Sequence, residues 1–115
     1  MKIATWNINS IRARLERLLA WLQKAQPDVL CLQELKVADE AFPYEAIRQA
    51  GYHVAVFGQK TYNGVAILSR VEAQDIRRGM PAFEDPQARL LAAEVNGIWI
   101  VNAYVPNGET VGSEK

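Results

Sequence analysis

The chain has 115 residues, which is enough for a single domain with a modest hydrophobic core. Hydrophobic residues make up 50% of it and charged residues 23%, a composition that excludes an intrinsically disordered segment. Its 13 basic and 13 acidic residues cancel, so no overall positive charge draws the chain to nucleic acid. Any phosphate binding must therefore depend on the local placement of side chains.

Cysteine use and hydropathy indicate a cytoplasmic protein with no membrane partner. Cys31 is the only cysteine and lies in an apolar run, which excludes an internal disulfide and predicts a buried core thiol rather than a nucleophile. The N-terminus has no cleavable signal pattern, and no apolar run approaches the length of a membrane span. We therefore expect the protein in a reducing compartment, the cytoplasm.

The first third of the chain predicts a strand–helix–strand unit. Residues 2–7 form a short apolar run typical of a buried strand. Ser10 is the predicted N-cap of the helix that follows. The apolar positions of this helix recur at helical spacing: Ile11, Leu15, Leu18, Leu19 and Leu22. The segment 26–28 ends the helix, and residues 29–33 predict a second buried strand, parallel to the first because the crossover is helical.

The remaining two thirds predict one short helix and then strands joined by turns. The helix spans 43–50, beginning at a proline and ending just before a glycine. Short strands are expected over 52–57, 64–69, 72–78, 88–95 and 98–104. The dipeptide Asn96-Gly97 separates two apolar runs and is the strongest hairpin signal in the chain. Residues 79–86 predict a loop, and the polar tail 108–115 has no packing signal.

Two of the predicted strands end at polar residues that suit a hard metal ion. The first strand delivers Asn7, and the second delivers Glu34 with Lys36 two residues further on. Because parallel strands joined by one crossover end at the same edge of a sheet, Asn7 and Glu34 should meet where open α/β sheets usually bind ligands. Amide and carboxylate oxygens are ligands that Mg²⁺ accepts. The sequence therefore predicts one wall of a phosphodiesterase site.

Four segments, 5–14, 26–36, 62–69 and 102–108, carry a more specific signal. In their order and spacing they resemble the motifs of the exonuclease III family of abasic-site endonucleases. The family's later aspartate and Ser-Asp-His motifs do not occur in the sequence. The only histidine, His53, lies in a predicted strand, where a packed or surface role is expected.

The resemblance implies an α/β fold, namely half of a four-layer α-β-β-α sandwich in which a mixed sheet carries helices on one face. Residues 1–115 would form the N-terminal portion of an endonuclease/exonuclease/phosphatase domain. The implied activity is Mg²⁺-dependent incision of double-stranded DNA 5′ to abasic sites, or 3′-to-5′ exonuclease action, with Mn²⁺ as a substitute metal. We expect the isolated chain to be inactive or nearly so. Its uncovered sheet face should lead to a homodimer, a swapped assembly or poor solubility.

The resemblance also implies roles for individual residues. Glu34 would be the principal carboxylate ligand of Mg²⁺, and Asn7 would orient it or bind the waters of the metal. Tyr104 would be the catalytic residue, with its hydroxyl near the scissile phosphate. The residues expected to contact DNA are Lys36, Asn63, Asn107, Arg12 and Arg89.

Structural explanations for these residues stay open at this stage. The asparagines suit turns, the lysine and the arginines suit a solvated surface, and Tyr104 could cover a sheet edge. For Arg14 the surface explanation is favoured. Three aromatic residues lie in apolar runs and are predicted to pack in the core rather than stack on bases: Trp6, Trp21 and Trp99.

Two other functions also remain open. Phosphatases, sphingomyelinases and deadenylases of the same superfamily share the asparagine and glutamate motifs, although the segment 104–108 fits the DNA enzymes better. A non-catalytic module that binds a partner or DNA is the alternative from a different class.

Overall fold

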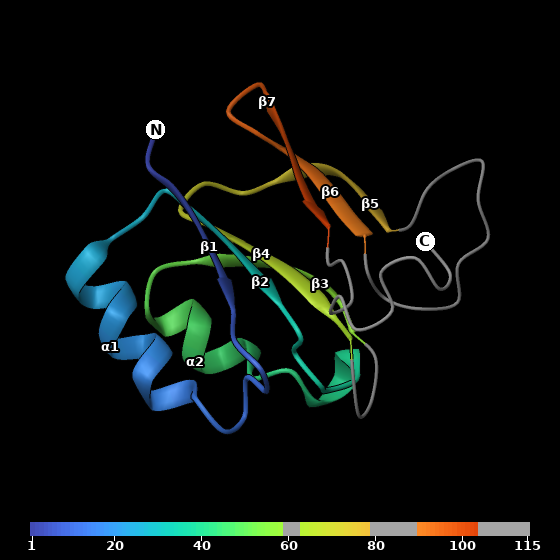
Figure 1. Cartoon of the computed structure of the whole chain (residues 1–115). Coiled ribbons are helices and arrows are strands. Elements are labelled where there is room, and N and C mark those ends of the chain that lie inside the picture. Colours follow the sequence, from blue (N-terminus) through green and yellow to red (C-terminus); the bar gives the residue numbers. More distant parts are fainter. Residues whose placement is uncertain (59–62, 79–89, 104–115) are drawn as a thin grey trace, which may run out of the picture.

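The computed structural model of the chain describes residues 1–58, 63–78 and 90–103. In these ranges a layer of helices, a four-stranded sheet and a three-stranded sheet lie one behind the other (Figure 1). This arrangement confirms the expected α/β class and the helices on one face of a mixed sheet. It corresponds to half of a layered sandwich.

The four-stranded sheet has the strand order β1-β2-β4-β3. β1 (Ile3–Asn7) and β2 (Val29–Gln33) are parallel and are joined by α1 (Leu15–Ala25). β4 (Val65–Ser69) is antiparallel to β2 on one side and to β3 (His53–Phe57) on the other. The predicted strand–helix–strand unit is therefore confirmed, and the strand bounds differ from the predicted ones by a residue at most.

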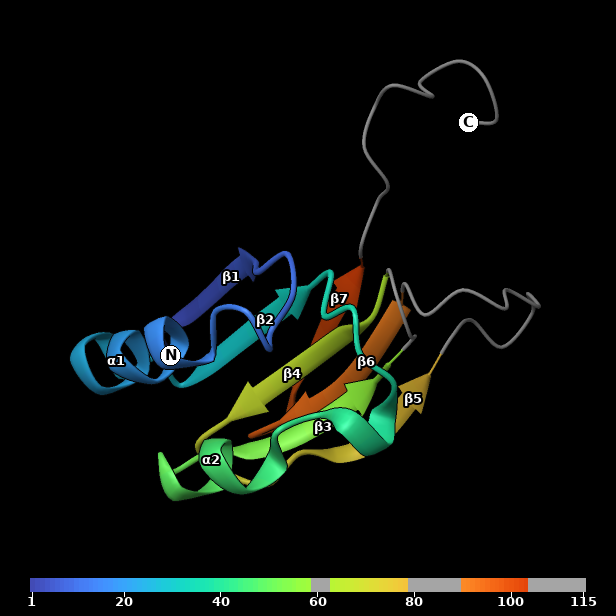
Figure 2. The ribbon, with the colours of Figure 1, turned by 90° about the horizontal axis from the view of Figure 1, so that it is seen from below.

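The helices cover one face of this sheet. α1 lies beside β1 and β2, while the short α2 (Tyr44–Gln49) lies beside β3 and follows the 3₁₀ turn η1 (Asp39–Ala41) (Figure 2). The core between the helices and the sheet contains fully buried side chains: Ile8, Ile11, Leu18, Leu30, Leu32, Leu35, Ile47 and Leu68. Trp6 and Trp21 pack against this core with their ring centroids 6.3 Å apart, as predicted.

The three-stranded sheet covers the opposite face. Its strands β5 (Gln74–Arg78), β6 (Leu90–Val95) and β7 (Ile98–Ala103) are antiparallel in that order. The predicted hairpin is present, because Asn96 and Gly97 adopt the positive φ angles, 52° and 79°, that such a turn requires. A second core fills the space between the sheets: Val29, Cys31, Ala55, Val65, Ile67, Leu91, Ala93, Val95 and Ile100.

Trp99 is exposed, so its predicted place in the core was wrong. Side chains alternate along β7, and Ile100 and Asn102 point into the space between the sheets. Trp99 and Val101 therefore face outward, with 47% and 61% of their surface exposed. The Arg77 guanidinium lies 5.6 Å from the centre of the Trp99 ring, so the indole has a cation–π partner instead of an apolar one.

The first helix begins later than predicted. Residues 11–14 form a turn, and α1 starts at Leu15 without a side-chain cap. Ser10 has a φ of 85°, and its Oγ accepts a hydrogen bond from the Ala13 amide at 3.3 Å, so it caps the turn rather than the helix. Within the described ranges α1 is the longest helix, with 11 residues, and none of the helices there could cross a membrane.

Candidate functional site

The candidate site lies at the edge of the four-stranded sheet where β1 and β2 end. Asn7 pairs with Gln33 in the parallel register, so the two strands stop at the same level. Three backbone hydrogen bonds continue the pairing into the loops beyond: Ile8 N to Gln33 O (3.0 Å), Ser10 N to Glu34 O (2.8 Å) and Ile11 N to Leu35 O (3.0 Å). The two loops are therefore fixed to each other and carry their polar side chains on a defined frame.

Buried apolar residues alternate with polar ones along both loops. The anchors are fully buried: Ile8, Ile11 and Leu35. Asn7 and Asn9 flank Ile8 and are exposed, and Glu34 and Lys36 flank Leu35 and are partly exposed. The apolar side chains hold the backbone in the core while the polar ones stay within reach of a ligand.

The backbone at this edge is strained. Five of the eight non-glycine residues with positive φ in the described ranges belong to it: Asn9, Ser10, Glu34, Lys36 and Asn63. The left-handed region is unfavourable for side-chain-bearing residues, and such residues gather at functional sites when the surrounding structure holds them there. Here the cross-loop hydrogen bonds hold Glu34 at a φ of 57°.

The side chains of the site contact one another directly. Asn7 Nδ2 donates a hydrogen bond to Glu34 Oε2 at 3.0 Å. Lys36 Nζ lies 3.9 Å from Glu34 Oε1 and also donates a hydrogen bond to Asn9 Oδ1. The Glu34 side chain is 21% exposed. A neutral donor and a cation therefore fix the carboxylate from two sides while part of it faces solvent.

These residues fit one side of a magnesium shell. No group of three His, Cys, Asp or Glu side chains that could hold a metal lies within residues 1–58, 63–78 and 90–103. The oxygen donors at this edge are the Glu34 carboxylate and the side-chain oxygen of Asn7. Mg²⁺ is usually held through one or two carboxylates and keeps several of its waters, so this donor set suits it, and Mn²⁺ takes the same kind of ligand.

A buried polar pair beneath the site was not predicted from the sequence. Gln33 and Asn102 are 9% and 3% exposed, and Gln33 Nε2 donates to Asn102 Oδ1 at 2.8 Å across the two sheets. Gln33 Nε2 also lies 2.8 Å from Thr5 Oγ1. Asn102 Nδ2 donates to the carbonyl oxygens of Leu32 and Ala66, both at 2.8 Å. The sequence signal that could have indicated this pair is a single amide side chain within each of two apolar strands, at a position that faces the core.

The other predicted site residues are only partly located. Arg12 is exposed in the turn before α1. Asn63 is 7% exposed and its carbonyl oxygen accepts a hydrogen bond from the Lys36 amide at 3.1 Å, which brings it to the same edge as Glu34. Three predicted residues lie outside the described ranges: Arg89, Tyr104 and Asn107.

Cys31 and His53 are not part of this edge. Cys31 is 7% exposed between the sheets, and burial raises the pKa of its thiol to about 11, so it is a protonated core residue as predicted. His53 is exposed at the start of β3, where it pairs with Ser69, which in turn pairs with Val29 at the start of β2. It therefore lies at the opposite end of the sheet from Glu34.

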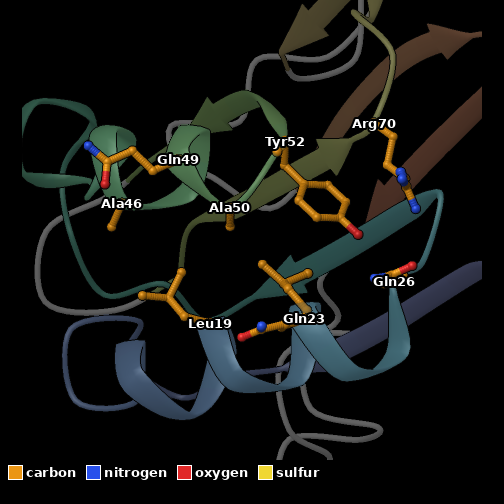
Figure 3. Close-up of a pocket in the computed structure, with 10 residues that line it drawn as sticks. Leu19, Gln23, Gln26, Ala46, Gln49, Ala50, Tyr52 and Arg70 are labelled. Carbon is orange, nitrogen blue, oxygen red and sulfur yellow. The ribbon is translucent and has the colours of Figure 1, made fainter.

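A hollow of about 510 Å³ between α1 and α2 is also separate from the site (Figure 3). Its polar lining comes from three glutamines, from Tyr52 and from Arg70. The Tyr52 hydroxyl is engaged, because it donates to the Pro27 carbonyl at 2.7 Å. The lining has no carboxylate, so this hollow lacks the anionic oxygen ligand that divalent cations such as Mg²⁺ usually take.

Comparison with known proteins gives consistent matches. Residues 4–112 match the model of the endonuclease/exonuclease/phosphatase family. The chain is 47% identical to exodeoxyribonuclease III of Haemophilus influenzae, over 99% of this chain and 45% of that protein.

Solved structures are similarly close. The 3′ phosphatase NExo from Neisseria, bound to a product DNA hairpin, is 49% identical with a TM-score of 0.91, over 95% of this chain and 43% of that one. An AP endonuclease from Archaeoglobus fulgidus is 44% identical with a TM-score of 0.91, over 99% of this chain and 44% of that one. The chain thus spans less than half the length of the relatives it matches.

Proposed function

Because the chain belongs to the endonuclease/exonuclease/phosphatase family, we propose that it forms the metal-binding part of a DNA-repair phosphodiesterase of the exonuclease III type. The observation that carries the proposal is the contact between Asn7 and Glu34, 3.0 Å apart at adjoining strand ends. A carboxylate fixed in this way is suited to hold a cation against a phosphate. The relatives of the chain, an exodeoxyribonuclease and an AP endonuclease, support DNA as the substrate.

The chain's own residues would act on the metal and the phosphate together. Glu34 and Asn7 would hold Mg²⁺ or Mn²⁺, which when bound polarises a phosphoryl oxygen and offsets charge in the transition state. Asn7 orients the carboxylate through its amide, and Lys36 lies 3.9 Å from the same carboxylate, where its ammonium group would meet a phosphate. Tyr104 would supply a hydroxyl near the scissile bond. The proposed contacts to DNA phosphates are Arg12, Asn63, Arg89 and Asn107.

The type of DNA site on which the enzyme acts is a second question within this proposal. The similarity to an AP endonuclease supports incision 5′ to an abasic site, and the similarity to exodeoxyribonuclease III supports 3′-to-5′ exonuclease action. The 49% identity to a 3′ phosphatase favours a further candidate, removal of phosphate groups from 3′ ends. All three reactions need a metal-held phosphate at the Glu34 edge, so they differ in how the DNA is placed rather than in the chemistry.

The isolated chain should be a slow enzyme at best. Its described part provides one carboxylate at the metal edge, and its only histidine lies at the far end of the sheet. Losing a general base or a charge-stabilising group typically lowers the rate by orders of magnitude. We therefore expect the isolated chain to cut DNA at trace rates at most. The compartment that we propose for it is the cytoplasm.

Cleavage of matched substrates tests the proposal. The chain, in excess, is incubated with a duplex that carries one abasic site, with a duplex that ends in a 3′-phosphate, and with the corresponding RNA, each with Mg²⁺ and with a chelator. Glu34→Gln is compared with Glu16→Gln, which makes the same change on an exposed position of α1. Any cutting should be restricted to DNA, require metal and disappear only in Glu34→Gln.

Three results would contradict the proposal. Rapid metal-dependent cutting that Glu34→Gln leaves unchanged would remove Glu34 from the site. Preference for RNA or for a non-nucleic phosphate ester would assign the chain to another branch of the family. Tight binding of a partner protein together with no metal binding would favour the non-catalytic alternative.

The outer face of β7 supports self-association as part of this proposal. On this face Trp99 and Val101 expose 47% and 61% of their surface, Ile98 at the start of the strand exposes 47%, and β7 is an edge strand. Exposed apolar side chains beside an open strand edge favour pairing with another chain. Light scattering should therefore detect homodimers, and Val101→Lys should shift them to monomers. A monodisperse monomer at high concentration would contradict this expectation.

A further inference from the structure

We propose that the buried pair Gln33 and Asn102 positions the Glu34 carboxylate by tying β7 to β1 and to the end of β2. The inference rests on the proposed function, in which Glu34 holds the metal. It concerns residues that lie behind the metal edge and that do not touch the substrate. Their role would be to fix the direction in which Glu34 leaves its strand.

The hydrogen bonds of Gln33, the last residue of β2, connect three strands. Its side-chain amide donates to Thr5 in β1 and to Asn102 in β7, at 2.8 Å each. Its backbone carbonyl oxygen accepts a hydrogen bond from the Ile8 amide at 3.0 Å. Gln33 is also the residue directly before Glu34. One amide therefore joins both sheets at the point where the metal edge begins.

Asn102 completes this connection from the second sheet. Its amide group donates to the carbonyl oxygens of Leu32 and Ala66, which face each other in the β2–β4 pairing. Each of these bonds spans more than 30 residues of sequence, so they record tertiary packing rather than a local turn. Asn102 thereby holds β7 against the backbone of β2 and β4 beside Gln33.

A purely structural explanation of the pair is less economical. Buried amides are unfavourable unless every group is satisfied, and an apolar pair would fill the space between the sheets without that requirement. The neighbouring inward residues Cys31 and Ile100 are apolar in the same strands. Gln33 directly precedes Glu34, whose backbone is held at a φ of 57°.

Amide hydrogen exchange in the metal-free, full 115-residue chain tests the positioning role. The probes are Ser10 and Lys36, whose amides donate to Glu34 O and Asn63 O at the edge. In Asn102→Leu these amides should exchange at least about tenfold faster relative to the amides of β3 and β4. Val95→Ala lies in the same inter-sheet core but outside the network. It should raise the exchange rates of the Ser10 and Lys36 amides and of the β3 and β4 amides by the same factor.

A milder pair of variants keeps the test valid if Asn102→Leu does not fold. Thr5 is exposed, so Thr5→Val should fold while removing one acceptor of Gln33, and Thr5→Ser should retain it. Thr5→Val is expected to accelerate amide exchange at Ser10 and Lys36, and Thr5→Ser is expected to show the wild-type exchange rates at both. Equal exchange at these two amides in wild type, Asn102→Leu and Thr5→Val would overturn the inference.

Metal affinity separates this inference from the proposed function. Residues behind metal ligands typically change affinity 10- to 100-fold, and we expect about a tenfold loss of Mn²⁺ affinity in Asn102→Leu. If wild type and Glu34→Gln bind Mn²⁺ equally, the proposed function fails whatever the exchange data show. If Glu34→Gln loses binding while Asn102→Leu keeps both wild-type affinity and wild-type exchange, only the positioning role fails.

Discussion

Asn7→Asp provides a sharp test of the geometry at the metal edge. The substitution replaces the amide that donates to Glu34 with a second carboxylate at the same place, 3.0 Å away. A hydrogen bond becomes a like-charge contact in the absence of metal. With a divalent cation present, the same pair offers two carboxylate ligands instead of one, which is the arrangement that Mg²⁺ and Mn²⁺ prefer.

The size of the effect follows from the separation and the partial burial of Glu34. Two unit charges about 3 Å apart repel by about 5.5 kcal/mol at an effective dielectric constant of about 20 and by about 1.4 kcal/mol in water. The Glu34 side chain is 21% exposed and Lys36 lies 3.9 Å from it, which offsets part of the repulsion. We therefore expect Asn7→Asp to lower the free energy of unfolding by about 1–3 kcal/mol near neutral pH.

The pH dependence has a definite sign. Repulsion raises the folded-state pKa of the carboxylate pair above its unfolded value. The destabilisation is therefore full where both carboxylates are ionised, and it is relieved as the pH falls and the pair binds a proton. Saturating Mn²⁺ should relieve it at neutral pH by bridging the two carboxylates.

Urea unfolding at pH 7 and pH 5, with and without Mn²⁺, measures these differences. Asn9→Asp is the matched control, because it adds the same charge beside Lys36, which already donates to Asn9. The control should be as stable as wild type or slightly more so. Equal stability of Asn7→Asp and Asn9→Asp at pH 7, with no response to Mn²⁺, would refute the placement of Asn7 against Glu34.

Three further predictions concern the scaffold. Burial raises the pKa of the Cys31 thiol from 9.0 to about 11, so the folded chain should resist alkylation near neutral pH and react after unfolding. The contribution of the protonated thiol to the free energy of unfolding is full below pH 9.0 and is lost as the pH rises through 11. Tyr52→Phe removes the hydrogen bond to Pro27 and should cost about 1 kcal/mol in urea unfolding. Gly58→Ala would place its Cβ 2.6 Å from the Val37 carbonyl oxygen, so we expect a loss of about 1–3 kcal/mol, and an unchanged melting temperature would contradict that contact.

The parts of the fold with local signals were predictable from the sequence. Apolar periodicity and the punctuating residues of the loops marked the strand–helix–strand unit and both helices, and Asn96-Gly97 marked the hairpin. The meeting of Asn7 and Glu34 followed from the parallel direction of β1 and β2, since one helical crossover leaves the two strand ends at one edge.

Features set by distant contacts were not predictable. Ser10 was misjudged as a helix cap because its backbone is fixed by the carbonyl of Glu34, which is remote in the sequence. Trp99 was misjudged because an apolar run does not reveal which face of its strand will be covered. The Gln33–Asn102 contact joins residues 69 apart, and only the packing of the two sheets brings them together.

Titration of the chain with Mn²⁺, followed by electron paramagnetic resonance, tests the central claim most directly. The claim is that Glu34, oriented by Asn7, holds the divalent metal. The wild-type chain and Glu16→Gln should bind Mn²⁺ with the same affinity, and Glu34→Gln should bind it at least about tenfold more weakly. Equal binding by all three proteins, or no binding by any of them, would contradict the claim.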